Sequence, residues 1–339
     1  MIELFEQLLN QIQENSQDYK LVTDIRGEGN WEELSNEKIK LLEEIVKRVL
    51  IDDPIGRLVF RGQSFENEAE LLNVELCGDI KEKIDQKLFP RLFNIGEKAK
   101  AFYHDIKSQR TFNITVEECE ILFDDIAKKL KKNVCGIIQF CKDEKGFVTY
   151  FNDSNNKSTF VCKLMNNDKN IFAFYKCIEH ILGSNDKSLN ISTSEKVEIA
   201  NKFSGKQYLN NGLIIGYVIP KEYNYENRKY PFSQRSDSLL TINGKIRKLE
   251  LPSIGNWPFS GQKEVCVTGC LFPHLIWFII DLRYKRIVIN PHIFIEGLRK
   301  DSVFIDLNQS NFRKEIQLTK YSGYVTYYFD IGEFNSNFL

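Results

Sequence analysis

The hydrophobic pattern of this 339-residue chain changes along its length, and the change limits the folds that the chain can adopt. Apolar residues recur at helical spacing in about the first 50 residues, as in the run from Ile39 to Val49. From about Val134 onward, short runs rich in Ile, Val, Tyr and Phe are separated by polar turns, which is typical of strands. We therefore predict an α+β fold with helices early and a strand-dominated core later.

Individual elements follow from the same pattern. Thr115 and Glu118 have the spacing of a capping box, which predicts a helix start at that point, and the helix ends in the lysines 128–132. The sequence Arg26-Gly-Glu-Gly-Asn is interpreted as a turn. The predicted helices are residues 2–12, 39–49, 115–132, 171–182 and 195–203. The predicted strands are residues 134–140, 147–151, 159–164, 213–219, 246–251, 263–267, 275–282, 286–289 and 324–329.

Composition and charge exclude several classes of protein. Hydrophobic residues make up 42% of the chain, which is enough for a folded core. The net charge of -1 argues against a nucleic-acid coat or a membrane-surface binder, although a local basic groove stays open. The N-terminus has no secretory-signal pattern, and the apolar stretch 271–282 is interrupted by Pro273 and His274 and is too short to cross a bilayer. We expect a soluble, cytoplasmic protein with no membrane partner.

The cysteines and histidines give no sign of a metal site. The eight cysteines form no CxxC pair, and the four histidines form no HExxH motif or mixed cluster. We expect reduced, mostly buried thiols and no structural metal.

Three separated segments carry the residues of chemical interest. The first is an apolar strand, residues 58–60, that delivers Arg61 and then Gly62. Taken alone, this segment is an ordinary strand end with a salt-bridged arginine and a turn glycine.

The second segment is a strand that ends in Ser192-Thr193-Ser194 and runs into the helix 195–203. Ser192 and Glu195 also have the spacing of a capping box, so Ser192 could close the helix start as well as serve a site.

The third segment is Gly261-Gln-Lys-Glu-Val265, in which Gln262 and Glu264 are expected to share one face of a strand by the two-residue period. Taken alone, it is an ordinary charged strand edge.

Read in this order, the three segments resemble the Arg-Ser-Glu class of ADP-ribosyltransferases, which includes cholera toxin, Rho-modifying exoenzymes and arginine-specific transferases. The helix 195–203 followed by the strand 213–219, and the stretch from Glu264 to Ile279, are also similar to the pattern of that family after each motif. The resemblance covers roughly residues 55–295. Phe60-Arg-Gly-Gln63 is similar, in addition, to the motif of a domain named for Phe-Arg-Gly.

The resemblance implies a fold with an ADP-ribosyltransferase-like split antiparallel β core. We expect a helical segment in residues 1–55, a catalytic domain in residues 56–300 with an insertion at about 100–182, and C-terminal strands packed on the core in residues 301–339. The insertion is expected because the stretch between Arg61 and Ser192 is longer than the family usually shows. Arg57 and Arg91 are the alternatives for the arginine of the first motif.

The resemblance also implies the activity: NAD⁺ is consumed as a substrate and its ADP-ribose is transferred to an acceptor. Cleavage of the nicotinamide–ribose bond passes through an oxocarbenium-like state, which the Glu264 carboxylate would stabilise. Arg61 would match the NAD⁺ pyrophosphate with a bidentate guanidinium. Ser192 would hold Glu264 still by a hydrogen bond.

Further NAD⁺ contacts are implied for Gly62, Thr193 and Ser194, the last two of which could instead support the strand. An aromatic residue after the serine motif often packs near nicotinamide in the family. Phe203 and Tyr208 are the candidates here, and core packing is an equal alternative for Phe203.

Gln262 is expected to face the acceptor. In the family a Glu at this position accompanies arginine modification, and a Gln accompanies asparagine acceptors or nucleic-acid bases. A neutral amide cannot take a proton from a guanidinium, so arginine is disfavoured. We expect a protein acceptor, with RNA or DNA as the alternative, and an antitoxin or chaperone as a candidate partner. A non-catalytic binding module is the competing hypothesis from another class.

Overall fold

The chain forms two compact units in the computed structural model. Unit 1 consists of Met1–Arg110, Thr193–Asn224 and Cys270–Leu339, and unit 2 consists of Thr111–Ser192 and Tyr225–Gly269. The structure describes residues 2–12, 18–24, 30–52, 56–65, 78–95, 115–166, 190–205, 212–220, 236–237, 250–252, 254–255, 260–268 and 275–294. Helices and a mostly antiparallel sheet occur together, so the fold is of mixed α and β type, as the sequence predicts.

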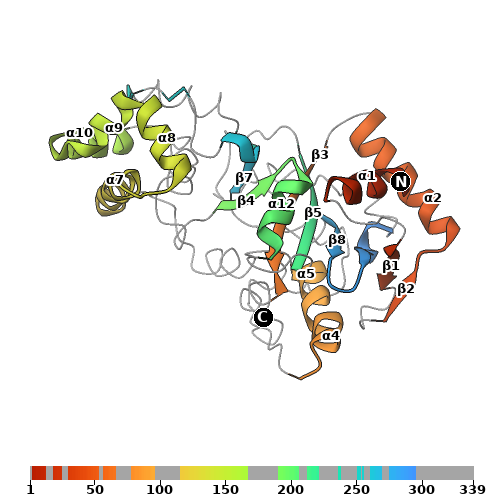
Figure 1. The fold of residues 1–339 in the computed structure, drawn as a ribbon. Helices are drawn as coiled ribbons and strands as arrows, with labels where there is room; N and C mark the ends of the chain where they lie inside the picture. Colours follow the sequence, from red (N-terminus) through yellow and green to blue (C-terminus); the bar gives the residue numbers. More distant parts are fainter. Residues whose placement is uncertain are drawn as a thin grey trace. The chain divides into compact units, whose positions relative to one another are not determined.

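Unit 1 is built on a sheet with the strand order β2-β1-β9-β8-β5-β3-β4 (Figure 1). The pairing of β1 with β9 is parallel, whereas β1–β2, β8–β9, β5–β8, β3–β5 and β3–β4 pair in the antiparallel sense. The strands are β1 Lys20–Asp24, β2 Trp31–Glu33, β3 Gly56–Ser64, β4 Asn190–Ser194, β5 Gly212–Pro220, β8 Ile276–Asp281 and β9 Arg286–Ile289.

The central strands of unit 1 are apolar on both faces because both faces are covered. Every residue of β8 and β9 is buried, which explains their nearly unbroken apolar sequence. The register between β5 and β8 shifts at Gly216 and Tyr217, where Trp277 is the extra residue of a β-bulge. The bulge lets Trp277 join the same core cluster as its neighbour Phe278.

Helices α1 Ile2–Gln11, α2 Asn36–Val46 and α12 Val197–Ser204 supply apolar residues to that core cluster. Phe5 of α1 meets Phe278 edge-on, with ring centroids 5.0 Å apart. The approach of α12 depends on glycine in β3, because a Cβ on Gly62 would lie 1.7 Å from the Ala200 carbonyl oxygen. Gly62 therefore faces α12, and its strand neighbours Arg61 and Gln63 face away from it.

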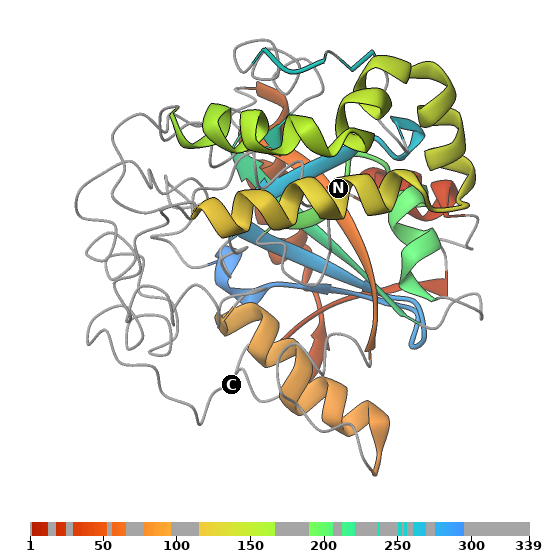
Figure 2. The same cartoon turned by 90° about the vertical axis from the view of Figure 1, so that its left-hand side faces the viewer.

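A second helical element of unit 1 carries a buried ion network. It runs through α4 Ile80–Lys83, η3 Ile84–Leu88 and α5 Phe89–Ile95, drawn in orange in Figure 2. Arg286 of β9 donates from Nε to Asp281 at 2.7 Å and from Nη1 to Asp85 of η3 at 3.2 Å. All three side chains are buried. Burial opposes the charge on Arg286, but the hydrogen bond to Asp85 and the two carboxylates outweigh it and raise the pKa of the guanidinium.

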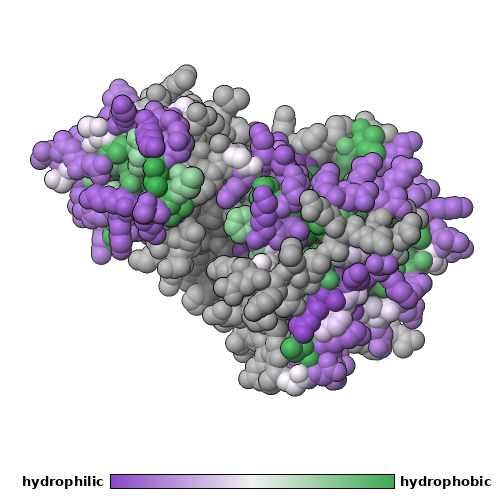
Figure 3. All heavy atoms as spheres, viewed as in Figure 1, coloured by the Kyte–Doolittle hydropathy of each residue, from purple (hydrophilic) through white to green (hydrophobic). Residues whose placement is uncertain are grey.

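Unit 2 contains a group of four helices, which we call the helical group: α7 Val116–Leu130, α8 Cys135–Asp143, α9 Lys145–Asn152 and α10 Lys157–Met165, with the short η4 Ser154–Asn156 before α10. The capping box at Thr115 is confirmed: its Oγ1 accepts from the Glu118 amide at 3.1 Å, and the Glu118 carboxylate accepts from the Thr115 amide at 2.9 Å. Hydrophilic side chains cover much of the outer surface of this group, with apolar ones visible between them (Figure 3). The buried aromatic residues of its core are Phe123, Phe140, Phe147, Phe151 and Phe160.

The remaining described elements of unit 2 are β6 Ser236–Asp237, η6 Ser260–Gln262 and β7 Glu264–Thr268. The first residues of β4 belong to this unit, and the strand order there is β4-β7-β6.

The predicted strands 134–140, 147–151 and 159–164 are wrong, since these residues form α8, α9 and α10. Their apolar residues are buried at helical spacing, as for Phe147 and Phe151, whose ring centroids lie 4.6 Å apart. The strands β1 and β2 lie between the two predicted N-terminal helices, in a stretch for which the sequence predicts a turn and no strand.

The other predicted elements fall into two groups. The helices near the N-terminus and at 115–132 and 195–203, and the strands at 213–219, 263–267, 275–282 and 286–289, are confirmed within a few residues at their ends. Glu250 and Leu251 lie in no strand. The turn after Arg26, the helix 171–182, the strand residues 246–249 and 324–329, and the segment 301–339 lie outside the described residues.

The prediction of mostly buried cysteines is wrong for part of the chain. Cys119 is buried, Cys141 is half-buried, and Cys135 and Cys162 are exposed, because the last two lie on the solvent side of α8 and α10. Burial raises the pKa of the Cys119 thiol to about 11. Among the described helices, none has the length and apolar character needed to span a membrane.

Candidate active site

The structure brings together two of the sequence-predicted site residues, Ser192 and Glu264. Ser192 lies on β4 and Glu264 is the first residue of β7, and the Ser192 hydroxyl donates a short hydrogen bond to Glu264 Oε1. Both side chains are partly buried, and both residues belong to unit 2. A carboxylate held by a hydroxyl from a neighbouring strand loses rotamer freedom, which is the arrangement expected of a preorganised negative charge.

Ser192 does not cap the following helix. Helix α12 begins after Lys196, which makes no side-chain capping hydrogen bond. It is Ser194 whose Oγ accepts from the Lys196 amide, at 3.0 Å, and closes the turn between strand and helix. The capping-box interpretation of Ser192 is therefore wrong, because its hydroxyl is engaged with Glu264 instead.

Thr193 and Ser194 continue β4 into unit 1, where Ser194 pairs with Phe60 of β3. Their exposed fractions are only 3% and 4%. Buried side chains of this kind fit the supporting role that the sequence leaves open for them better than direct contact with a ligand.

The prediction that Gln262 and Glu264 share a strand face is wrong. Gln262 is the last residue of η6, and it lies two residues before the start of β7. Between them, Lys263 has a φ of 47°, in the left-handed region, so the backbone is not extended there. The two-residue alternation that would align the two side chains starts only at Glu264.

A lysine that the sequence indicates only as part of a helix end lies within electrostatic reach of Glu264. Burial lowers the pKa of Lys129, Lys132 lowers it further, and the negative charge of Glu264 raises it. Lys129 is in the last turn of α7 and is half-buried. The sequence alone does not distinguish Lys129 from Lys128, Lys131 and Lys132. Its proximity to Glu264 depends on how unit 2 folds.

Arg61, the arginine of the first motif, lies in unit 1 on β3, directly opposite Ile215 of β5. Its side chain is half-buried. The buried Gln63, two residues further along the strand, faces the same side of the sheet. With its amide oxygen turned to the guanidinium, Gln63 accepts from Arg61 Nε at 3.0 Å and also from Nη2.

The alternative arginines have other surroundings. Arg57 lies on the same strand and forms an ion pair with Glu195, with a nitrogen–oxygen distance of 3.4 Å. Arg91 lies in α5.

Gly62 is buried in the packing between β3 and α12, whereas Phe203 is exposed. Gly62 is buried in β3 against α12, so the close approach of that helix already requires a glycine. Phe203 of α12 is 53% exposed, which removes core packing as an explanation for it. Tyr208 lies outside the described residues.

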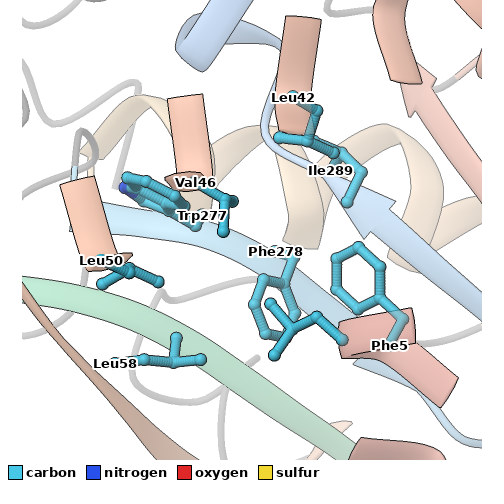
Figure 4. Close-up of a pocket in the computed structure, with 9 residues that line it drawn as sticks. Phe5, Leu42, Val46, Leu50, Leu58, Trp277, Phe278 and Ile289 are labelled. Atoms are coloured by element: carbon cyan, nitrogen blue, oxygen red, sulfur yellow. The ribbon is translucent and has the colours of Figure 1, made fainter. Parts of the chain in front are cut away.

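A small cavity in unit 1 is lined only by apolar side chains (Figure 4). The Nε1 of Trp277 is buried without a hydrogen-bond partner. A dinucleotide needs charged and hydrogen-bonding groups, so we interpret this cavity as a packing gap of the core. Its lining residues are Leu4, Phe5, Leu42, Val46, Leu50, Leu58, Trp277, Phe278 and Ile289.

Within the part of the chain that the structure describes, no group of three or more His, Cys, Asp or Glu side chains is arranged to hold a metal ion. Comparison of the chain with protein-family models, with curated proteins and with solved structures finds no match.

Proposed function

We propose that the chain is a mono-ADP-ribosyltransferase with an ADP-ribosyltransferase-like split β core, which cleaves the nicotinamide–ribose bond of NAD⁺ and transfers ADP-ribose to a protein acceptor. The observation that supports this function is the hydrogen bond between Ser192 and Glu264. These residues come from two motifs that are distant in the chain. The resemblance to the Arg-Ser-Glu class implies that the serine of one motif holds the glutamate of the other.

In this proposal Glu264 is the catalytic residue. Positive charge develops on the ribose as nicotinamide departs, and a fixed carboxylate stabilises that charge more strongly than water does. The Ser192 hydroxyl holds the carboxylate from one side. Lys129 of α7 lies within electrostatic reach of the same carboxylate.

Arg61 is the proposed ligand of the NAD⁺ pyrophosphate. A guanidinium offers a planar pair of donors that a lysine cannot offer. Phe203 is proposed to contact nicotinamide, because an exposed aromatic ring is free to stack on a ligand.

The acceptor is proposed to approach Gln262, which precedes Glu264 by two residues and is half-buried in η6. A nucleic-acid acceptor is the second candidate. The observation in its favour is the group of lysines at the end of α7, of which Lys129 lies in electrostatic reach of Glu264 and Lys128, Lys131 and Lys132 are exposed.

The test is incubation of the full-length protein with NAD⁺ labelled in the adenosine part, with nicotinamide release and label transfer measured together. Glu264→Gln is expected to reduce nicotinamide release by about 10²–10³-fold, since one transition-state contact is lost. Gln262→Ala is expected to spare much of the NAD⁺ cleavage and to lose transfer. Glu250→Gln is the matched control, because Glu250 is an exposed glutamate of unit 2 that pairs with Lys163.

Wild-type turnover in Glu264→Gln would contradict the proposal. A protein that releases no nicotinamide and labels nothing would instead be a non-catalytic binding module. Label in RNA or DNA, with binding that weakens steeply with salt, would select the nucleic-acid acceptor over the protein acceptor.

A further inference from the structure

Gln63 is a buried polar residue for which the motif resemblance supplies no role. Its exposed fraction is 8%. Leu213, its partner on β5, and Phe65, two residues further along the chain, are both buried and apolar. Burying a carboxamide is costly unless its polar atoms are satisfied. With the amide assigned so that its oxygen faces Arg61, that oxygen accepts from Nε at 3.0 Å and from Nη2.

We propose that Gln63 is the positioning residue for Arg61 and sets the orientation in which the guanidinium meets the NAD⁺ pyrophosphate. This inference rests on the proposed function. Gln63 acts through Arg61 and need not touch NAD⁺ itself.

The geometry suits this role because Gln63 occupies one edge of the guanidinium. A guanidinium has five N–H donors in a fixed plane. Acceptance from Nε and Nη2 uses one edge of that plane and fixes its rotation about the side-chain axis. Because the guanidinium is planar, this contact also fixes the directions of the Nη1 donors on the other side. Donors with fixed directions are what a bidentate match to a phosphate group requires.

The charge of the partner also suits a binding role. Gln63 is neutral, so this contact adds no negative charge beside the Arg61 guanidinium. Arg286 provides the contrast within the same unit, because two carboxylates, from Asp85 and Asp281, accept its hydrogen bonds. Arginine held by carboxylates is neutralised locally, whereas an amide orients the side chain without that effect.

The backbone of β3, which carries Arg61 and Gln63, is held by the neighbouring strand β5 and by helix α12. Strand β3 pairs with β5 along its whole length, from Gly56 opposite Pro220 to Ser64 opposite Gly212. Gly62, between the two residues, is in close contact with the carbonyl oxygen of Ala200. A fixed strand converts the Gln63–Arg61 contact into a fixed direction for the guanidinium.

The experiment measures NAD⁺ affinity in a Glu264→Gln parent protein, in which turnover is expected to be slow enough for an equilibrium measurement. Gln63→Met removes the acceptor at nearly unchanged size, and it is expected to weaken NAD⁺ binding about tenfold, as for the loss of one hydrogen bond to a charged group. Arg61→Lys is expected to weaken binding at least as much. The double variant is expected to bind no more weakly than Arg61→Lys alone, because Gln63 acts only through the guanidinium.

Gln63→Glu is the second variant, in case the methionine is poorly tolerated. It keeps an acceptor of the same length but adds a negative charge, so it is expected to weaken NAD⁺ binding as the carboxylate neutralises Arg61 and repels the pyrophosphate. Thermal unfolding of each variant shows whether the fold is retained.

The outcomes separate this inference from the proposed function. A parent protein that neither binds nor, with Glu264 restored, cleaves NAD⁺ would overturn both. A parent that binds NAD⁺, together with folded Gln63 variants that bind it equally well, would overturn the positioning role alone. Losses that add up independently in the Arg61→Lys, Gln63→Met double variant would also overturn it, because additivity means that Gln63 does not act through Arg61.

Discussion

Unit 1 and the helical group of unit 2 bury their side chains in different ways. In unit 1, strands distant in the sequence pair with one another, as β1 does with β9, and charged residues are buried between the sheet and a helix. In the helical group, consecutive helices pack their phenylalanines together, and Phe123 lies 5.1 Å from Phe151 between ring centroids. Unit 1 thus adds buried polar contacts with strict geometry to its apolar core, whereas the helical group is held mainly by apolar contacts that tolerate adjustment.

The largest expected difference concerns ion pairs. Arg286→Ala in unit 1 takes the guanidinium away from two buried carboxylates, of which Asp85 keeps an ion pair with Lys81 at 3.6 Å, and should reduce the free energy of unfolding by about 3 kcal/mol. The matched change in unit 2 is Lys157→Ala, which removes a pair with Asp124 at 2.7 Å in which the Asp124 side chain is 63% exposed. That change should cost about 0–1 kcal/mol. Urea unfolding followed by circular dichroism measures both, and equal losses would break the comparison.

A smaller difference is expected for glycines. Gly62→Ala places a methyl group against the backbone of α12 and should destabilise unit 1 by about 1–3 kcal/mol. In the helical group, a Cβ on Gly146 would have no atom within 4 Å. Gly146→Ala, near the start of α9, should therefore stabilise the protein by about 0.5 kcal/mol. Thermal unfolding of the two variants decides the matter, and a neutral Gly62→Ala would show that α12 can move away freely.

The smallest expected difference concerns helix starts. The Thr115 box in unit 2 has two reciprocal hydrogen bonds, whereas Ser35 in unit 1 accepts a single one from the Lys38 amide at 3.3 Å. Thr115→Ala should cost about 1 kcal/mol, and Ser35→Ala should cost less. The midpoints of urea unfolding give both values, and a larger loss for Ser35→Ala would reverse the order proposed for the two caps.

The contrast between the units also explains how much of the fold the sequence could predict. Strands β5 and β8 are recognisable because they are long, unbroken apolar runs that need cover on both faces. The runs that form α8, α9 and α10 are short and rich in Phe and Val, so their composition indicates strands while the spacing of their buried residues is helical. Weight given to spacing rather than composition would have favoured helices there.

The candidate site divides in a similar manner. Ser192 and Glu264 could be predicted as partners because each lies in a short motif, and the resemblance supplies the contact between the motifs. Gln63 and Lys129 could not be assigned from the sequence. The role of Gln63 depends on the orientation of the Arg61 side chain, and that of Lys129 depends on how α7 is placed with respect to Glu264. The left-handed backbone at Lys263 could not be predicted from the sequence either, because lysine rarely adopts that conformation.

The β-bulge at Trp277 has a practical consequence for spectroscopy. The bulge turns this indole into an apolar cavity, where it is 2% exposed and its N–H meets no acceptor. An indole shielded from water in this way emits at shorter wavelength than one in solvent. Of the three tryptophans, Trp31 and Trp277 belong to unit 1 and Trp257 to unit 2. With Trp257 replaced by Phe, the fluorescence of the protein would therefore follow the opening of the sheet unit alone, without an added dye.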